Sequence, residues 1–241
     1  MTTEKKCLIV IPARYGSTRF PGKPLAMIQG MSMIQRVYNQ CISSQGDAVI
    51  VATDDERIFN HVNAFGGQVI MTSAVHASGT DRCAEAARNC KLDFDFVINV
   101  QGDEPFIDPL QINQVIEVLL SKNASIATLA VPIHSSDELQ DSNRVKVVMS
   151  RDLRCLYFSR SAIPHDREKT GVHAFRHLGI YGFQREVLQE ITRLEPSSLE
   201  KAEVLEQLRW LENGYEIFAG ITDNAALSVD IPEDINRLSA G

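Results

Sequence analysis

Short apolar runs alternate along the first half of the chain with longer stretches in which apolar residues recur every three or four positions. The runs have the length of buried β-strands, and the stretches have the period of amphipathic helices. The predicted strands are Cys7–Pro12, Ala48–Ala52, Gln68–Met71, Phe94–Val100 and Ser125–Val131. The predicted helices are Met33–Ser43, Ile58–Phe65, Asp81–Cys90 and Leu110–Leu120, and the second of them ends at Gly66 and Gly67. This alternation predicts an α/β fold with a mostly parallel sheet flanked by helices.

The second half of the chain has a different pattern, with shorter strands. Val145–Met149 and Arg154–Ser159 flank a turn at Arg151–Asp152 and predict a hairpin. His165–Phe175 is polar and lacks a period, which predicts a mobile loop. The other predicted elements are strands Leu178–Phe183, Glu216–Ala219 and Leu227–Val229, and helices Glu186–Leu194, Leu199–Asn213 and Pro232–Leu238. We predict a single domain over residues 1–241 that carries a small β-rich insertion at about 143–183.

Composition narrows the range of partners. The chain has 241 residues and a net charge of −7, which argues against a nucleic-acid partner. Its five cysteines are an odd number without a CxxC pair, a pattern typical of a reducing compartment. No apolar run approaches the ~18–20 residues of a membrane span, and Cys7–Ile11 is too short for a signal peptide. We therefore expect a cytoplasmic protein without a membrane partner.

The loop after the first strand, IPARYGSTRFPGKPL, carries three cations within ten residues: Arg14, Arg19 and Lys23. A glycine- and cation-rich loop that follows a strand is a general way of holding phosphate groups. The loop matches neither the Walker A pattern nor GxGxxG, since Pro24 follows Lys23. A solvated basic loop is the alternative, and the residues of the loop alone leave the two interpretations about equal.

Two carboxylates lie where strands are predicted to end. Asp103 follows the fourth strand in the segment NVQGDEP, and Asp230 precedes the last predicted helix in SVDIPEDI. Ligands of open α/β sheets bind beyond the carboxyl ends of the strands. Mg²⁺ there typically takes one or two carboxylates together with phosphate oxygens. The alternatives are a solvated acidic turn for Asp103 and a helix N-cap for Asp230.

The segment ASGTDR is a small polar turn that leads into a helix. Its backbone amides and hydroxyls suit recognition of a base or ribose. The alternative is a purely local role, in which Thr80 caps the helix that begins near Asp81.

The sequence resembles the 3-deoxy-manno-octulosonate cytidylyltransferase family from about Ile9 to the end of the chain. The motifs that carry the resemblance are IPARYGSTRFPGKPL, VATDDERI, SGTDR, NVQGDEP, LYFSR, RHLGIYGF, LEQLR and VDIPEDI. The resemblance implies a Rossmann-like nucleotidyltransferase fold and the transfer of CMP from CTP to an acidic eight-carbon sugar, with release of pyrophosphate. It also implies Mg²⁺ dependence, a homodimer and a place in lipopolysaccharide synthesis.

The resemblance also implies roles for particular residues. Those matched to CTP binding are Arg14, Ser17, Arg19, Lys23, Ser78, Gly79, Thr80 and Asp103. Those matched to the sugar are Gln101, Arg160, His177, Tyr181 and Glu206, with Gln207 and Arg209 adjacent. Those matched to the metal are Asp103 and Asp230, which together with Arg14 and Lys23 form the expected catalytic set. Taken alone, Tyr181 in its apolar strand could equally be a core residue, and Arg209 a solvated helix residue.

Since no histidine or glutamate is an evident general base, we predict metal activation of the attacking hydroxyl, with the cations stabilising the departing pyrophosphate. Three other functions remain open from the sequence. They are a cytidylyltransferase for another acidic sugar, including an amino variant of the octulosonate, a glycosyltransferase, and an inactive nucleotide-binding regulator. The second would usually show an Asp-x-Asp motif, whereas here Gly102 lies between Gln101 and Asp103.

Overall fold

The computed structural model describes residues 5–16, 20–224 and 234. The chain divides into two compact units, Met1–Asn113 with Ala226–Gly241 and Gln114–Ala225. The predicted insertion at about 143–183 lies within the second unit, which is larger because it also contains strands and helices on both sides of that segment. The single-domain organisation stays a prediction, since compactness does not show whether either unit folds alone.

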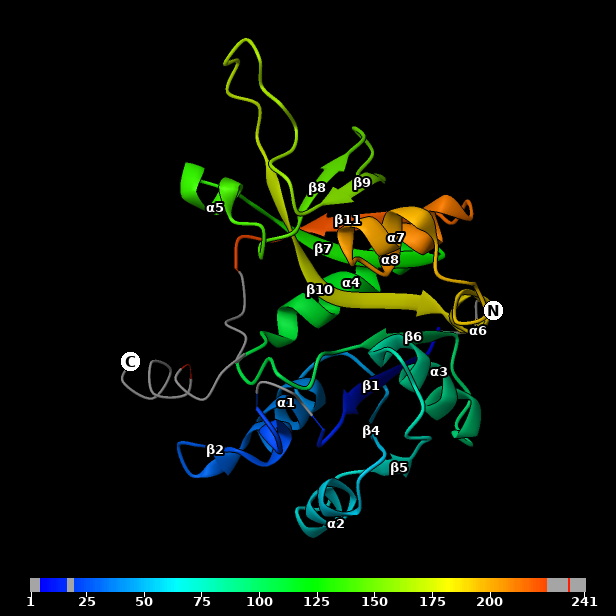
Figure 1. Ribbon diagram of the computed structural model, residues 1–241. Helices are drawn as coiled ribbons and strands as arrows, with labels where there is room; N and C mark the ends of the chain where they lie inside the picture. Colours follow the sequence, from blue (N-terminus) through cyan, green and yellow to red (C-terminus); the bar gives the residue numbers. More distant parts are fainter. Residues whose placement is uncertain (1–4, 17–19, 225–233, 235–241) are drawn as a thin grey trace. The chain divides into compact units, whose positions relative to one another are not determined.

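The first unit is built on a parallel sheet in the order β6-β1-β4-β5. Its strands are β1 (Cys7–Ala13), β4 (Ala48–Thr53), β5 (Val69–Met71) and β6 (Phe96–Asn99), and its helices are α1 (Met33–Ile42), α2 (Glu56–Ala64), α3 (Gly79–Asn89) and the start of α4 (Pro109–Ser121). Helices α1 and α3 both pack on β1 and lie on either side of it (Figure 1). The predicted α/β fold with its mostly parallel sheet is confirmed, and the long apolar strand β1 is buried along almost its whole length.

Three short elements were not predicted: a 3₁₀ turn at the end of the opening loop, η1 (Lys23–Leu25), and the strand pair β2 (Met27–Ile28) and β3 (Met31–Ser32) that follows it. Ile28 and Met33 are fully buried there, against Phe20 and Phe106. These elements are too short to produce a periodic pattern. They anchor the end of the loop next to the start of α1.

The second unit contains a mixed sheet in which β7 lies between β11 and β10. Its strands are β7 (Ile126–Pro132), β8 (Lys146–Met149), β9 (Cys155–Ser159), β10 (Phe175–Gln184) and β11 (Ile217–Ile221), and it also contains α5 (Ser136–Gln140) and α6 (Arg185–Ile191). Strand β7 runs parallel to β11 and antiparallel to β10. The predicted hairpin is confirmed as β8–β9. The segment 160–174 forms neither helix nor strand and extends away from these strands (Figure 1), while its mobility stays a prediction.

The predicted single helix Leu199–Asn213 is wrong. The structure has two helices, α7 (Ser198–Glu203) and α8 (Gln207–Glu212), separated by Val204 in the left-handed region with φ 54° and ψ 51°. The reason is a tertiary contact: the Nε of Arg160 donates to the carbonyl oxygen of Glu203 at 2.7 Å, where a continuous helix would use that oxygen internally. This contact offsets the roughly 1–2 kcal/mol that a left-handed residue with a side chain costs.

Within the part of the chain that the structure describes, no helix combines the length and the apolar character needed to cross a membrane. Strand Leu227–Val229 and nearly all of helix Pro232–Leu238, as predicted from the sequence, lie outside the described residues.

Candidate active site

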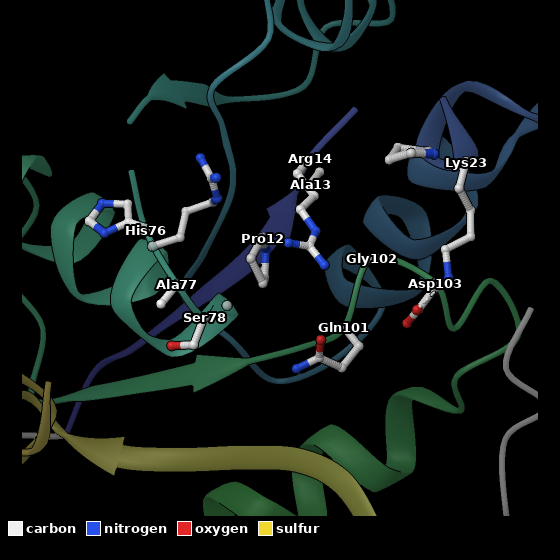
Figure 2. Close-up of a pocket in the computed structure, with 13 residues that line it drawn as sticks. Pro12, Ala13, Arg14, Lys23, His76, Ala77, Ser78, Gln101, Gly102 and Asp103 are labelled. Atoms are coloured by element: carbon white, nitrogen blue, oxygen red, sulfur yellow. Dashed lines mark hydrogen bonds and ion pairs between the residues drawn. The ribbon is translucent and has the colours of Figure 1, made fainter. Parts of the chain in front are cut away.

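A pocket of about 250 Å³ opens in the first unit beyond the carboxyl ends of β1 and β6 and at the start of α3. It is lined by Pro12, Ala13, Arg14, Lys23, Pro24, His76, Ala77, Ser78, Gly79, Arg82, Gln101, Gly102 and Asp103. Figure 2 shows Arg14 between Lys23 on one side and Ser78 on the other. The structure therefore brings together, in one place, residues from three separate motifs of the sequence.

The opening loop is folded back on itself so that both described cations reach this pocket. The amide of Gly22 donates to the carbonyl oxygen of Tyr15 at 2.9 Å, and Gly22 adopts a positive φ of 72°. The guanidinium carbon of Arg57 lies 3.3 Å from the centre of the Tyr15 ring, a cation–π contact that holds the first part of the loop. Arg14 is exposed, and Lys23 begins the 3₁₀ turn η1.

Asp103 lies on a tight turn that begins at Gln101, whose carbonyl oxygen accepts from the amide of Glu104 at 3.3 Å. Gly102 is required there by space, because a Cβ atom would lie 2.9 Å from the carbonyl oxygen of Pro12. The turn brings a carboxylate oxygen of Asp103 to 2.7 Å from the Nζ of Lys23. The Lys23 side chain is 13% exposed and that of Asp103 34%, so the carboxylate is the more accessible partner of this ion pair.

The third motif supplies the start of α3. Ser78 is the N-cap: its hydroxyl accepts from the amide of Asp81, and its amide donates to the Asp81 carboxylate, both at 3.1 Å. The alternative that Thr80 caps the helix is therefore wrong. Ser78 and Gly79 line the pocket, whereas Thr80 is buried and is not part of the lining. A helix N-terminus facing a pocket favours negatively charged ligands there.

Two polar residues of the pocket were not predicted from the sequence. Arg82 is buried and bonds the Asp54 carboxylate at 2.9 Å and the Thr72 hydroxyl at 2.6 Å. His76 makes a short hydrogen bond to the Glu85 carboxylate. Helical periodicity could have indicated Arg82, because it lies one turn before the buried Ala86, but the signal for His76 is absent from the pattern.

The residues predicted to bind the sugar fall into both units. Gln101 lines the pocket of the first unit, and the others lie in the second unit. There, the rings of His177 and Tyr181 are neighbours on β10, with centroids 5.2 Å apart. Burial raises the pKa of Tyr181 well above its usual range, and the nearby Cys155 and Glu206 add to the effect. Burial also lowers the pKa of His177 to about 3, so its ring is neutral at pH 7.

Arg160 has a set of partners that the sequence did not predict. Its side chain donates to three carbonyl oxygens: Nε to that of Glu203 at 2.7 Å, Nη1 to that of Ser142 at 3.1 Å and Nη2 to that of Val204 at 3.4 Å. The amide of Arg160 donates to the Glu203 carboxylate at 2.9 Å. Arg160 therefore fixes the junction between α7 and α8, two residues before Glu206.

Glu206 lies 3.3 Å from the guanidinium of Arg209, which also bonds Glu200 at 3.0 Å. Arg209 is 9% exposed and Gln207 5% exposed, so neither is a solvated helix residue. The predicted site residues Ser17, Arg19 and Asp230 lie outside the described residues.

The pocket has a charge pattern suited to a phosphorylated ligand. Its described lining contains the cations Arg14, Lys23 and Arg82 and one carboxylate, Asp103. Among the residues that the structure describes, no three His, Cys, Asp or Glu side chains gather into a metal site of their own. A single carboxylate in a pocket lined by cations fits Mg²⁺, which is commonly held by one or two carboxylates, by substrate phosphates and by water.

The chain is similar to known proteins along nearly its whole length. The profile of the family described as Cytidylyltransferase matches residues 8–217. The chain is 50% identical to the 3-deoxy-manno-octulosonate cytidylyltransferase of Parabacteroides distasonis, over 98% of this chain and 97% of that protein. It is 47% identical to the 8-amino-3,8-dideoxy-manno-octulosonate cytidylyltransferase of Shewanella halifaxensis, over 96% of both chains.

A solved structure agrees with the sequence relatives. The structure of a CMP:2-keto-3-deoxy-manno-octonic acid synthetase in complex with CTP is 42% identical, with a TM-score of 0.94 over 98% of both chains. Both the sequence and the fold therefore match over nearly the full length. The chain belongs to the 3-deoxy-manno-octulosonate cytidylyltransferase family, and it is a nucleotidyltransferase.

Proposed function

We propose that this enzyme transfers CMP from CTP to the anomeric hydroxyl of 3-deoxy-D-manno-octulosonate and releases pyrophosphate. The observation that carries the proposal is the meeting of Arg14, Lys23 and Asp103 in one pocket beside the start of α3. In the reaction, the sugar oxygen forms a bond to the α-phosphorus, the bond from that phosphorus to the bridging oxygen breaks, and the hydroxyl proton leaves to solvent.

The cations of the pocket act on the triphosphate. Arg14 can fork onto two phosphate oxygens, and Lys23 acts as a point charge on the part that leaves. The ion pair with Asp103 holds Lys23 in place before the ligand arrives, and the bond from the Gly22 amide to Tyr15 holds the backbone next to Arg14. Donors placed in advance where negative charge grows lower the barrier of the reaction. We assign Ser17 and Arg19 to the same phosphates from the sequence, and Ser78, Gly79 and Thr80 to the nucleoside.

Asp103 and Asp230 would hold Mg²⁺ together with the phosphate oxygens. The bound ion would polarise the α-phosphate and lower the pKa of the attacking hydroxyl. Asp103 fits this role because its partly exposed carboxylate faces the phosphate-binding pocket and has two oxygens, one of them paired with Lys23. The role of Asp230 rests on the sequence alone.

For the sugar we assign Gln101, Arg160, His177, Tyr181 and Glu206. The substrate carries a carboxylate, and a guanidinium is the side chain that forks onto one. His177 and Tyr181 offer a neutral imidazole and a phenol, which suit sugar hydroxyls. The buried Tyr181 hydroxyl has no hydrogen-bond partner among the described residues, which supports a role in contacting a ligand.

Replacing Arg160 with lysine is expected to raise the KM for the sugar by about 10- to 150-fold and to leave CTP affinity unchanged. A lysine cannot fork onto a carboxylate, and a hydrogen bond to a charged group contributes about 1.5–3 kcal/mol. Steady-state kinetics with varied sugar, and calorimetry with CTP alone, measure the two effects. The matched control is Arg144→Lys, since Arg144 lies in the same unit on the surface, 3.8 Å from Asp141.

The carbonyl contacts of Arg160 add a second readout to this experiment. If Arg160 serves only to hold α7, the lysine variant will melt at a lower temperature and its sugar KM will stay near the wild-type value. Weaker CTP binding with an unchanged sugar KM would place Arg160 in the nucleotide site and contradict the assignment.

The decisive test of the whole function is pyrophosphate release with each nucleoside triphosphate and a panel of acidic sugars. We expect release with CTP and the octulosonate, and little with sialic acid. Preference for the 8-amino sugar would move the assignment to the amino variant. Release with no sugar of the panel, despite tight CTP binding, would favour an inactive regulator, and transfer from a nucleotide sugar would favour a glycosyltransferase.

We further propose that the product serves lipopolysaccharide synthesis and that the enzyme acts as a cytoplasmic homodimer. The pathway and the dimer rest on the family resemblance, and the cytoplasmic location rests on the cysteine pattern and the short apolar runs of the sequence. Light scattering on the purified chain would test the dimer.

A further inference from the structure

A buried threonine touches the imidazole of His177. Thr128 lies on β7 and is 0% exposed. Its hydroxyl oxygen is 3.0 Å from Nε2 of His177, 3.1 Å from the carbonyl oxygen of Leu178 and 2.8 Å from that of Ile180. The register of β10 against β7 shifts between Leu178 and Tyr181, and this irregularity brings both carbonyl oxygens to one hydroxyl.

The hydrogen count at this hydroxyl limits the state of the imidazole. A threonine hydroxyl has one hydrogen to donate, and a carbonyl oxygen can only accept. Two carbonyl oxygens compete for that hydrogen, and the carbonyl oxygen of Ile180 at 2.8 Å is nearer to the hydroxyl than Nε2 of His177 at 3.0 Å. The hydrogen therefore goes to a carbonyl oxygen, and the hydroxyl lone pair faces His177. An attractive contact at 3.0 Å then requires a hydrogen on Nε2.

The surroundings of the ring decide between the neutral and the charged form. His177 is half-buried between the rings of Phe158 and Tyr181, with centroids 5.0 Å and 5.2 Å from its own. Burial is the cause of its lowered pKa of about 3. A neutral ring with its hydrogen on Nε2 has a lone pair on Nδ1, and this atom has no hydrogen bond among the described residues.

We propose that Thr128 is a positioning residue that fixes His177 in the Nε2–H tautomer and thereby presents Nδ1 as an acceptor for a hydroxyl group of the sugar. The second half of the proposal rests on the assignment of His177 to the sugar. The first half does not, because it concerns the enzyme without any ligand. An imidazole held in one tautomer discriminates between donors and acceptors, which a freely tautomerising ring would not do.

The test uses the whole enzyme with ¹⁵N-labelled histidine, with and without sugar. The His177 signals are assigned by their loss in His177→Gln. In the ligand-free wild-type enzyme at neutral pH, we expect the nitrogen shifts of a neutral ring with the hydrogen on Nε2. Thr128→Ser keeps the hydroxyl and should keep this spectrum. Thr128→Val removes the hydroxyl with little change in shape, and the single tautomer should be lost.

Kinetics provide the second readout. Thr128→Val should raise the KM for the sugar about fivefold, which is the effect of losing one neutral hydrogen bond. The KM for CTP should not change. Thr128→Ser should have a KM for the sugar close to that of the wild-type enzyme. The control is Thr192→Val, because the Thr192 hydroxyl bonds only carbonyls of its own helix, that of Leu188 at 3.2 Å and that of Gln189 at 3.4 Å. A general loss of stability would lower the melting temperature of both Thr128→Val and Thr192→Val and would leave the tautomer of His177 unchanged.

Three results would overturn the proposal in separable ways. An Nδ1–H ring or an imidazolium in the ligand-free enzyme overturns the tautomer assignment, whatever the enzyme's substrate. An unchanged tautomer in Thr128→Val overturns the role of Thr128. A tautomer lost as expected, with an unaltered sugar KM, overturns the contact to the sugar. Failure of the proposed function would appear differently, as absence of pyrophosphate release in the wild-type enzyme.

Discussion

Replacing Lys23 with alanine is expected to lower kcat by about 100- to 1,000-fold, with a smaller effect on the KM for CTP. The charge on the bridging oxygen of the triphosphate grows as the bond to the α-phosphorus breaks. A cation at that position interacts more strongly with the transition state than with bound CTP, so its loss appears in turnover. An ammonium group has three N–H donors, so Lys23 can contact a phosphate oxygen while it keeps its 2.7 Å bond to Asp103.

The first unit provides a matched control for this substitution. Lys5 forms an ion pair with Asp95 at 2.6 Å, and the two side chains are 53% and 36% exposed. Neither residue lines the active-site pocket. Lys5→Ala removes the same kind of ion pair, which contributes ~0–1 kcal/mol on a surface, and should leave turnover unchanged. A raised CTP KM with normal kcat in Lys23→Ala would show that Lys23 only binds the nucleotide.

Much of the first unit was predictable from the sequence because its elements are local. Strand β1 and helix α1 follow directly from the apolar pattern. The cations Arg14 and Lys23, which the structure brings to one pocket, also lie close together in the sequence. The backbone contact that shapes the turn at Asp103 was harder to predict. The need for Gly102 comes from the backbone of Pro12, a residue about ninety positions earlier, and no local pattern contains that contact.

The errors in the second unit have a common physical cause, which is that tertiary contacts override local preference. The residues from Leu199 to Asn213 have a helical pattern, but the guanidinium of Arg160 takes the carbonyl oxygen of Glu203 and ends α7 there. The predicted strand Leu178–Phe183 is part of the longer β10, because Phe175 and Arg176 pair with both β7 and β8. Pairing partners of this kind are not visible in a single strand's sequence.

The residue type at a position does not reveal which groups its side chain contacts in the fold. Arginine at position 160 was expected for a carboxylate, and the structure shows its side chain bonded to three carbonyl oxygens. The contacts of Lys146 were likewise not evident from its residue type. Lys146 is 0% exposed, and its ammonium donates to the carbonyl oxygens of Asp141 and Arg160 at 2.8 and 2.6 Å. A fully buried lysine is rare, and only the fold reveals the oxygens that make it possible.

The substitution Asp103→Asn is expected to lower turnover by about 100-fold or more at saturating Mg²⁺, with an unchanged circular dichroism spectrum. Removing outer-shell partners of a metal site already costs ~10–100-fold in affinity or activity, and loss of a direct ligand should cost more. Asparagine keeps the volume and the hydrogen-bond acceptor of Asp103 at the end of its turn. Since the ion pair with Lys23 is partly exposed, its loss should lower the free energy of unfolding by only ~0–1 kcal/mol.

Asp103 has two possible roles, as a metal ligand and as the partner that holds Lys23, and a double-variant cycle separates them. If Asp103 acts only through Lys23, adding Asp103→Asn to Lys23→Ala should cause no further loss of turnover. If it binds the metal, the double variant should be slower than either single variant. Asp95→Asn with Lys5→Ala is the matching control cycle on the ion pair outside the pocket.

Metal binding gives a readout that does not depend on turnover. Electron paramagnetic resonance of Mn²⁺ titrated into the CTP complex should show weaker binding in Asp103→Asn and unchanged binding in Asp95→Asn. Loss of turnover with normal Mn²⁺ binding would assign Asp103 to the orientation of Lys23. Normal turnover would remove Asp103 from the chemistry altogether and reduce it to the acidic turn that the segment NVQGDEP also allows.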